Sequence, residues 1–276
     1  MNDILIGFEI EMVFCSEHEY RPDGLHELKK RMIDIFKDKK YKCVINEYGP
    51  TQYKKKTIYI TDDWSIKATG RAAYKFFKDQ KAININIKGL YSVELLSPVL
   101  PMAEAIEFYK RISKKLFDTK LCYMNKSCGL HINVSHANRR DNIKLDIVKV
   151  LSTFNINKWR KIFKREHNQF CRTMPFNKWV LNRAIAKKNM AEVELKKDMD
   201  KKSSFKKYSA IAIHNWELGR RKTSRIEWRI SGGESAMDYK LVKSMIKDIS
   251  KSMWNGLTNR VITRKEVIKN LLTKVA

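Results

Sequence analysis

The sequence predicts a single α+β domain that carries a helical insertion. Segments with a two-residue apolar period alternate with segments of helical period, but without the regular strand–helix–strand order of a parallel α/β fold. Strand patterns occur near both ends of the chain, at residues 4–14 and 224–231. We expect these distant strands to share one sheet. The sequence also contains no internal repeat and no low-complexity linker that would separate two domains.

The strand at residues 4–14 has the clearest pattern. Apolar side chains at positions 4, 6, 8, 10, 12 and 14 fall on one face, whereas Glu9 and Glu11 fall on the other. Residues 24–37 follow with helical spacing. The chain then favours short strands at 41–46, 57–67 and 84–97.

The helix expected at 101–118 begins with Pro101, a residue that suits the first turn of a helix. A basic helical segment at 177–207 has the composition of a solvated lobe or lid. The domain is therefore expected to span residues 1–276, with the insertion at about 141–207. The remaining predicted elements are strands at 129–135, 208–215 and 224–231 and helices at 141–166, 236–253 and 264–273.

Composition excludes several classes of protein. The chain has 276 residues, of which 43% are hydrophobic and 32% charged, as in soluble globular proteins. No apolar run approaches the roughly 20 residues that span a bilayer, and acids interrupt the apolar N-terminal stretch, so we expect neither a membrane span nor a signal peptide. The five cysteines form no CxxC pair. We therefore expect a reducing, cytoplasmic location.

The net charge of +27 is the most unusual bulk property. Such an excess attracts nucleic acids, nucleotides and other polyanions. The chain is also rich in lysine, asparagine and isoleucine together, which an AT-rich genome favours regardless of function. The charge thus leaves contact with a polyanion open.

Glu9 and Glu11 are the first candidate site residues. Because a strand rises about 3.3 Å per residue, the two carboxylates lie about 7 Å apart on one face. They repel each other and are costly to bury without a cation. Oxygen ligands of this kind suit Mg²⁺ or Mn²⁺.

Three further strands place polar residues beside apolar ones. They carry Glu94, the pair His131 and Asn133, and the group Arg225, Glu227 and Arg229. Each pattern alone is typical of a solvated strand face. Together they supply ligands for two divalent cations and a cation for a polyphosphate.

These motifs resemble the amidoligase family, relatives of glutamine synthetase and glutamate–cysteine ligase. The matching elements, in order, are GFEIEM, D63-W-S65, VELLSPVL, CGLHINV and RIEWRISGG, so the resemblance covers residues 4 to about 250. It implies a glutamine-synthetase-like catalytic domain. Its fold would be a curved, mainly antiparallel sheet with a concave active-site face, backed by helices.

The resemblance also implies a role for each residue. Glu9, His131 and Glu227 would hold one metal ion near the nucleotide phosphates, and Glu11 and Glu94 would hold the other near the acceptor carboxylate. Arg229 would contact the transferred phosphoryl group. Asp63 and Ser65 match a family element in the metal surroundings or the substrate site. Apart from the resemblance, the residue types predict nucleotide contacts for His131 and Asn133, and a phosphate or substrate contact or a solvated surface charge for Lys67.

The implied activity is that of a ligase using ATP with Mg²⁺ or Mn²⁺. A substrate carboxylate attacks the γ-phosphate of ATP to give an acyl phosphate, and an amine then displaces phosphate to give an amide. The resemblance names neither substrate, and it leaves an oligomer possible.

Two other classes remain open. A basic nucleic-acid-binding protein without catalysis would explain the charge, but not the carboxylates in apolar strands. A metal-dependent nuclease or phosphatase would also use clustered carboxylates and a histidine. A ligase whose substrate belongs to a nucleic acid, or to a protein bound to one, would combine these features.

Overall fold

The fold is represented by a computed structural model. It describes residues 4–39, 41–46, 54–63, 87–136, 150–151, 153–167, 171, 210–214 and 225–257. The strands are β1 (Ile4–Ser16), β2 (Lys42–Ile45), β3 (Thr57–Asp62), β4 (Gly89–Leu96), β5 (Leu100–Pro101), β6 (Cys122–Tyr123), β7 (Gly129–His136), β8 (Ile211–His214) and β9 (Arg225–Gly232). The α-helices are α1 (Arg21–Ile35), α3 (Met102–Ile112), α5 (Ile156–Ile162) and α8 (Tyr239–Leu257).

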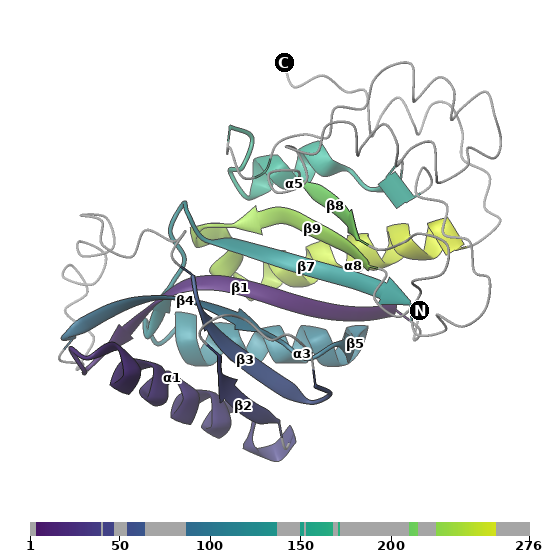
Figure 1. Ribbon diagram of the computed structural model, residues 1–276. Coiled ribbons are helices and arrows are strands. Elements are labelled where there is room, and N and C mark those ends of the chain that lie inside the picture. The colour runs from purple at the N-terminus through teal and green to yellow at the C-terminus, as the bar shows by residue number, and fades with distance from the viewer. Residues whose placement is uncertain are drawn as a thin grey trace, which may run out of the picture. The chain divides into compact units, whose positions relative to one another are not determined.

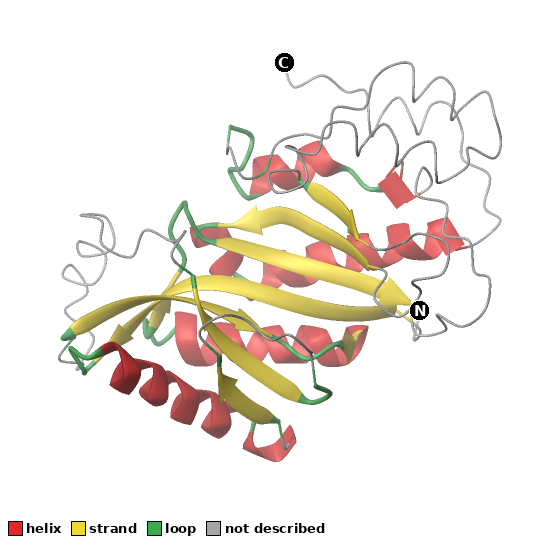
Figure 2. Ribbon diagram, in the orientation of Figure 1, coloured by secondary structure: helices red, strands yellow, loops and turns green. Residues whose placement is uncertain are grey.

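The described strands form a nine-stranded sheet. Its order is β2-β3-β4-β1-β7-β9-β8, and the short strands β5 and β6 also pair with β1. The pairs β1–β4, β1–β6, β3–β4 and β8–β9 are antiparallel, whereas β2 and β3 run parallel. Figure 2 shows the helices packed alongside the strands of the sheet. The predicted α+β class, with a mainly antiparallel sheet backed by helices, is therefore confirmed.

The chain divides into two compact units, which we describe separately. The N-terminal unit consists of Ile6–Ile132 and Ser231–Lys243. It holds most of β1, the strands β2 to β6, and the helices α1 and α3 (Figure 1). The C-terminal unit consists of Met1–Leu5, Asn133–Ile230 and Ser244–Ala276, and it includes α5, β8 and most of β9.

An aromatic cluster anchors β1 to the two helices of the N-terminal unit. The Phe108 ring of α3 stacks on Phe36, just after α1, with ring centroids 4.5 Å apart. Phe108 also stacks on Phe8 of β1, with centroids 6.2 Å apart. All three side chains are at most 2% exposed. Since Phe8 belongs to the predicted apolar face of β1, α3 packs on that face through Phe108, and Phe36 joins the cluster through the same ring. Glu9 and Glu11 lie on the opposite face of β1.

The C-terminal unit is built around Trp228 of β9, which is fully buried and packs against Phe154 with ring centroids 4.4 Å apart. The helix predicted at 141–166 is interrupted next to this contact. Residues 150, 151 and 153 are helical, and α5 starts afresh at Ile156, where the Asn155 side chain accepts a hydrogen bond from the backbone N–H of Lys158. Asn155 is therefore the N-cap of a new helix, so the predicted single helix is divided at this residue.

Several other expectations differ in detail or lie outside the described residues. The predicted helix 101–118 is α3 followed by a π-helix, Ser113–Phe117. The helix predicted at 236–253 is a short 3-10 turn, Glu234–Met237, followed by α8. The segment 177–207, the helix predicted at 264–273, Ser65 and Lys67 lie outside the described residues. Of the described helices, none is both long and apolar enough to cross a lipid bilayer.

Replacing Phe108 with alanine tests the aromatic anchor. We expect Phe108→Ala to lower the free energy of unfolding by about 3–5 kcal/mol, because it removes a buried ring and leaves a cavity between β1 and α1. Ile33→Ala is the control, since Ile33 is 43% exposed on α1 and should change stability by less than about 1 kcal/mol. Chemical denaturation measures both values, and equal losses would contradict the anchoring role.

Candidate metal centre and active site

Strand β1 presents its two acids within a buried setting. The predicted core face is confirmed, because Ile4, Ile6, Phe8, Ile10, Met12 and Phe14 are all at most 2% exposed. On the opposite face, Val13 and Cys15 are fully buried as well. The polar part of that face is thus confined to Glu9 and Glu11, whose side chains are 21% and 14% exposed.

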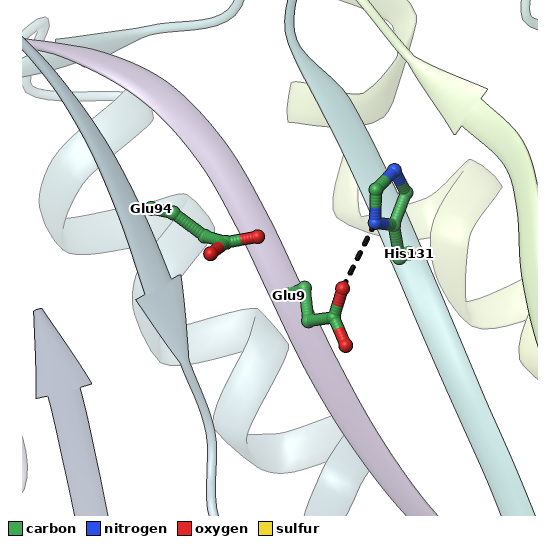
Figure 3. A group of neighbouring side chains, drawn as sticks. All are labelled: Glu9, Glu94 and His131. Atoms are coloured by element: carbon green, nitrogen blue, oxygen red, sulfur yellow. Dashed lines mark hydrogen bonds and ion pairs between the residues drawn. The ribbon is translucent and has the colours of Figure 1, made fainter. Parts of the chain in front are cut away.

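Glu9, Glu94 and His131 meet on this face, although they come from three different strands (Figure 3). One ligand atom from each lies within 4.8 Å of the other two. The Nδ1 atom of His131 lies 3.0 Å from Oε2 of Glu9. The resemblance had assigned Glu94 to the ion of Glu11, whereas the geometry gathers Glu94 with Glu9 and His131.

Glu11 is held from the side of β7. Its Oε2 atom accepts a 2.5 Å hydrogen bond from the backbone N–H of Gly129, and its Oε1 atom lies 3.6 Å from Nε2 of His131. A Cβ atom at Gly129 would come within 2.9 Å of His131 Nε2 and 3.0 Å of Glu11 Oε2. Because glycine has no Cβ atom, the Glu11 carboxylate and the His131 imidazole can approach the backbone at this position.

Glu94 lies directly across the β1–β4 pair from Glu11 and across the β3–β4 pair from Thr61. The Thr61 hydroxyl lies 3.3 Å from Oε2 of Glu94 and can donate to it. Burial raises the pKa of Glu94 to about 8, and the neighbouring negative charge of Glu9 adds to the rise. His131 opposes the shift, whereas Glu11 and Asp63 add smaller increments.

The donor set fits a divalent cation. Two carboxylates and one imidazole are ordinary ligands of Mn²⁺, and the carboxylate oxygens also suit Mg²⁺. A cation among these groups would counteract the burial and the repulsion that together raise the pKa of Glu94, because it favours the ionised carboxylate. The half-buried setting strengthens such an interaction, since water screens it less than at an open surface.

The remaining predicted site residues fall into two groups. Asp63 follows β3, is half-buried and acts on Glu94 through its charge. In the C-terminal unit, Arg229 donates from Nε to Oε1 of Glu227 at 2.5 Å. Glu227 is 4% exposed, so the neighbouring guanidinium compensates a buried charge.

Asn133 also belongs to the C-terminal unit. Its Oδ1 atom accepts a 2.7 Å hydrogen bond from Nε of Arg225. Asn133 of β7 and Arg225 of β9, both predicted polar strand residues, thus contact each other in this unit.

Sequence reasoning missed Thr61 and Gly129 as partners of the acids. Thr61 lies inside a segment that reads as an ordinary strand, and nothing in its type signals a carboxylate partner. Gly129 stands next to the predicted histidine, and a glycine inside a strand pattern is a signal of close backbone approach. That signal could have pointed to the contact with Glu11.

Residues 2–247 match the family described as "Putative amidoligase enzyme". The chain belongs to this family. No curated protein matches this chain.

Two solved structures are similar to this chain. One is the cryo-EM structure of Plasmodium falciparum glutamine synthetase, at 11% identity over 91% of this chain and 52% of that chain, with a TM-score of 0.36. The other is the crystal structure of a novel glutamine synthase homolog, at 9% identity over 98% of this chain and 61% of that chain, with a TM-score of 0.33. The chain thus spans 52% and 61% of the lengths of these two proteins.

Glu94→Gln tests how much the ionised Glu94 carboxylate destabilises the folded protein. Because the folded protein binds the Glu94 proton more tightly than the unfolded chain, its stability falls as pH rises from about 4.5 towards about 8. Without divalent cations, we expect Glu94→Gln to be more stable than the wild type above pH 8, by on the order of 2 kcal/mol. The difference should vanish below pH 4.5.

Thermal unfolding in EDTA across this pH range measures the effect. Glu104→Gln is the control, because Glu104 is exposed on α3. Adding Mn²⁺ at pH 8 should narrow the gap between Glu94→Gln and the wild type. A constant difference between the two proteins at every pH would contradict the clustered charges.

Proposed function

We propose that this amidoligase joins a carboxylate to an amine, using ATP and a divalent cation, through an acyl phosphate. The observation that supports this proposal is the group of Glu9, Glu94 and His131, with one ligand atom of each within 4.8 Å of the others. In a chain that belongs to the amidoligase family, such a group is the expected means of neutralising nucleotide phosphates.

The proposed cation is Mg²⁺ or Mn²⁺, held by Glu9, Glu94 and His131. When bound, it supplies positive charge beside the phosphate oxygens and so opposes the repulsion between ATP and an anionic substrate. The protein's own contribution is orientation. Thr61 and the backbone N–H of Gly129 hold the carboxylates of Glu94 and Glu11, so little rearrangement is needed when the substrates bind.

The proposed reaction has two steps. First, an oxygen of the substrate carboxylate attacks the γ-phosphorus of ATP, the bond to the β,γ-bridging oxygen breaks, and ADP leaves. The product is an acyl phosphate. Second, the amine nitrogen attacks the acyl carbon, inorganic phosphate leaves, and the nitrogen loses a proton to give the amide. Water must be kept out between the two steps, because it would hydrolyse the acyl phosphate.

Arg229 is the proposed contact for the transferred phosphoryl group. Its ion pair with Glu227 orients the guanidinium, and guanidinium N–H groups are strong donors to phosphate oxygens. From the family resemblance, we further propose that Glu227 serves a metal ion and that Asp63 and Ser65 serve the metal surroundings or the substrate. From their residue types alone, Lys67 and Asn133 are proposed contacts for the nucleotide or the substrate. Five cysteines present as free, buried thiols support the proposal of a reducing, cytoplasmic setting.

Nucleotide turnover tests the proposal. The protein is incubated with ATP and Mg²⁺ against panels of carboxylic acids and amines, and ADP, AMP and phosphate are followed. We expect release of ADP and phosphate that requires one carboxylate and one amine. His131→Ala and Arg229→Ala should each lower this rate by about 100-fold or more, because each removes charge that stabilises the transferred phosphoryl group.

Two controls separate loss of chemistry from loss of fold. Glu104→Gln changes an exposed acid and should keep the full rate. Arg229→Lys keeps a positive charge beside buried Glu227 but loses the planar fork, so it should fold and turn over slowly. Release of AMP would contradict the acyl-phosphate mechanism. Metal-dependent cleavage of nucleic acid without ATP would instead identify a nuclease.

A further inference from the structure

Helix α5 and the second half of α8 (Figure 1) both belong to the C-terminal unit, and their lysines define a basic face. We define it by Lys158, Lys161, Lys247, Lys251 and Trp254. The two helices are joined here, because Asp248 of α8 accepts a 3.0 Å hydrogen bond from Nε1 of Trp159 and lies 3.4 Å from the Lys158 ammonium. The lysines of both helices therefore belong to one surface region.

Helical geometry aligns the residues on α8. At 3.6 residues per turn, Lys247, Lys251 and Trp254 fall within a sector of about 60°. At 1.5 Å of rise per residue, successive members lie about 6 Å and about 4.5 Å apart along the axis. On α5, Lys158 and Lys161 are three residues apart and so share one face. The pattern is a row of cations that ends in an aromatic side chain.

Apart from Lys158, which pairs with Asp248, the lysines of this face have no ion-pair partner among the described residues. Lys161, Lys247 and Lys251 are exposed, and within the described part of the chain none of them takes part in an ion pair or a side-chain hydrogen bond. The one acid of the contact, Asp248, is occupied by Lys158 and Trp159. Three lysines are therefore available to a partner on a chain whose net charge is +27.

The environment of Trp254 favours a nucleic acid over a lipid surface as the partner of this face. This side chain is 39% exposed, whereas the apolar face of α8 is fully buried through Met245, Ile246, Ile249 and Met253. An amphipathic helix that enters a lipid surface needs that apolar face for the membrane. Here it packs inside the protein. Proteins that bind single-stranded nucleic acid combine aromatic side chains, which stack on bases, with cations, which neutralise phosphates. A tryptophan beside lysines is the same combination.

We propose that the basic face of α5 and α8 binds single-stranded nucleic acid, with the lysines at phosphates and Trp254 stacked on a base. Binding of this kind is tolerant of sequence, because every base offers an aromatic face. The inference is independent of the ligase chemistry. It assigns part of the positive charge to a defined surface.

Fluorescence anisotropy with labelled oligo(dT) tests this proposal on the full chain. We expect log K to fall linearly with log salt. The triple variant Lys161→Gln, Lys247→Gln, Lys251→Gln should reduce that slope by about 2, at roughly 0.7 per phosphate contact on a single strand. Trp254→Ala should weaken binding by about fivefold or more while leaving the slope unchanged.

The matched control replaces three lysines of the N-terminal unit, in the variant Lys88→Gln, Lys114→Gln, Lys115→Gln. It removes the same charge from exposed positions, so it should keep nearly the wild-type slope. Equal effects of the two triple variants would overturn the proposal, because only net charge would then matter. Absence of binding to oligo(dT), or binding to anionic vesicles alone, would overturn it as well.

Discussion

Repulsion among carboxylates on one face of β1 is the constraint on which the candidate site depends. Phe8 and its neighbours fix the opposite face in the core, so Glu9 and Glu11 cannot turn away from each other. The register then places Glu94 directly opposite Glu11. Three acids share a half-buried region. The cost of burying their charges and holding them close together appears as the raised pKa of Glu94. A fold that keeps such a cost at one place is typical of a functional site.

The local structure relieves this cost unequally. Glu11 receives a backbone N–H from Gly129, and Glu9 lies beside the imidazole of His131. Glu94 has only the Thr61 hydroxyl among the side-chain hydrogen bonds described for it. Glu94 therefore has the most to gain from a cation. The packing of the strands thus leaves Glu94 as a carboxylate that a metal ion would stabilise. In the proposed reaction, that metal ion assists the transfer of a phosphoryl group.

Strand periodicity explains how much of this could be predicted from the sequence. The two-residue period of β1 separates Phe8 from Glu9, and the same logic selects Glu94 and His131 as polar residues in apolar strands. It cannot tell which carboxylates share an ion, because that depends on the β1–β4 register and on the reach of each side chain. The two-residue strands β5 and β6 are too short to show a period. Asn155 divides a predicted single helix because a side-chain cap competes with helix continuation.

The most direct test of this account is the binding of Mn²⁺ to the protein without nucleotide, measured by calorimetry. We predict a site whose affinity falls by roughly 10–100-fold in Glu9→Gln, in Glu94→Gln and in His131→Ala, with no change in Glu104→Gln. Such a result would establish that three strands supply one metal centre. Unchanged Mn²⁺ affinity in folded Glu94→Gln and His131→Ala would contradict the central claim that these side chains form it.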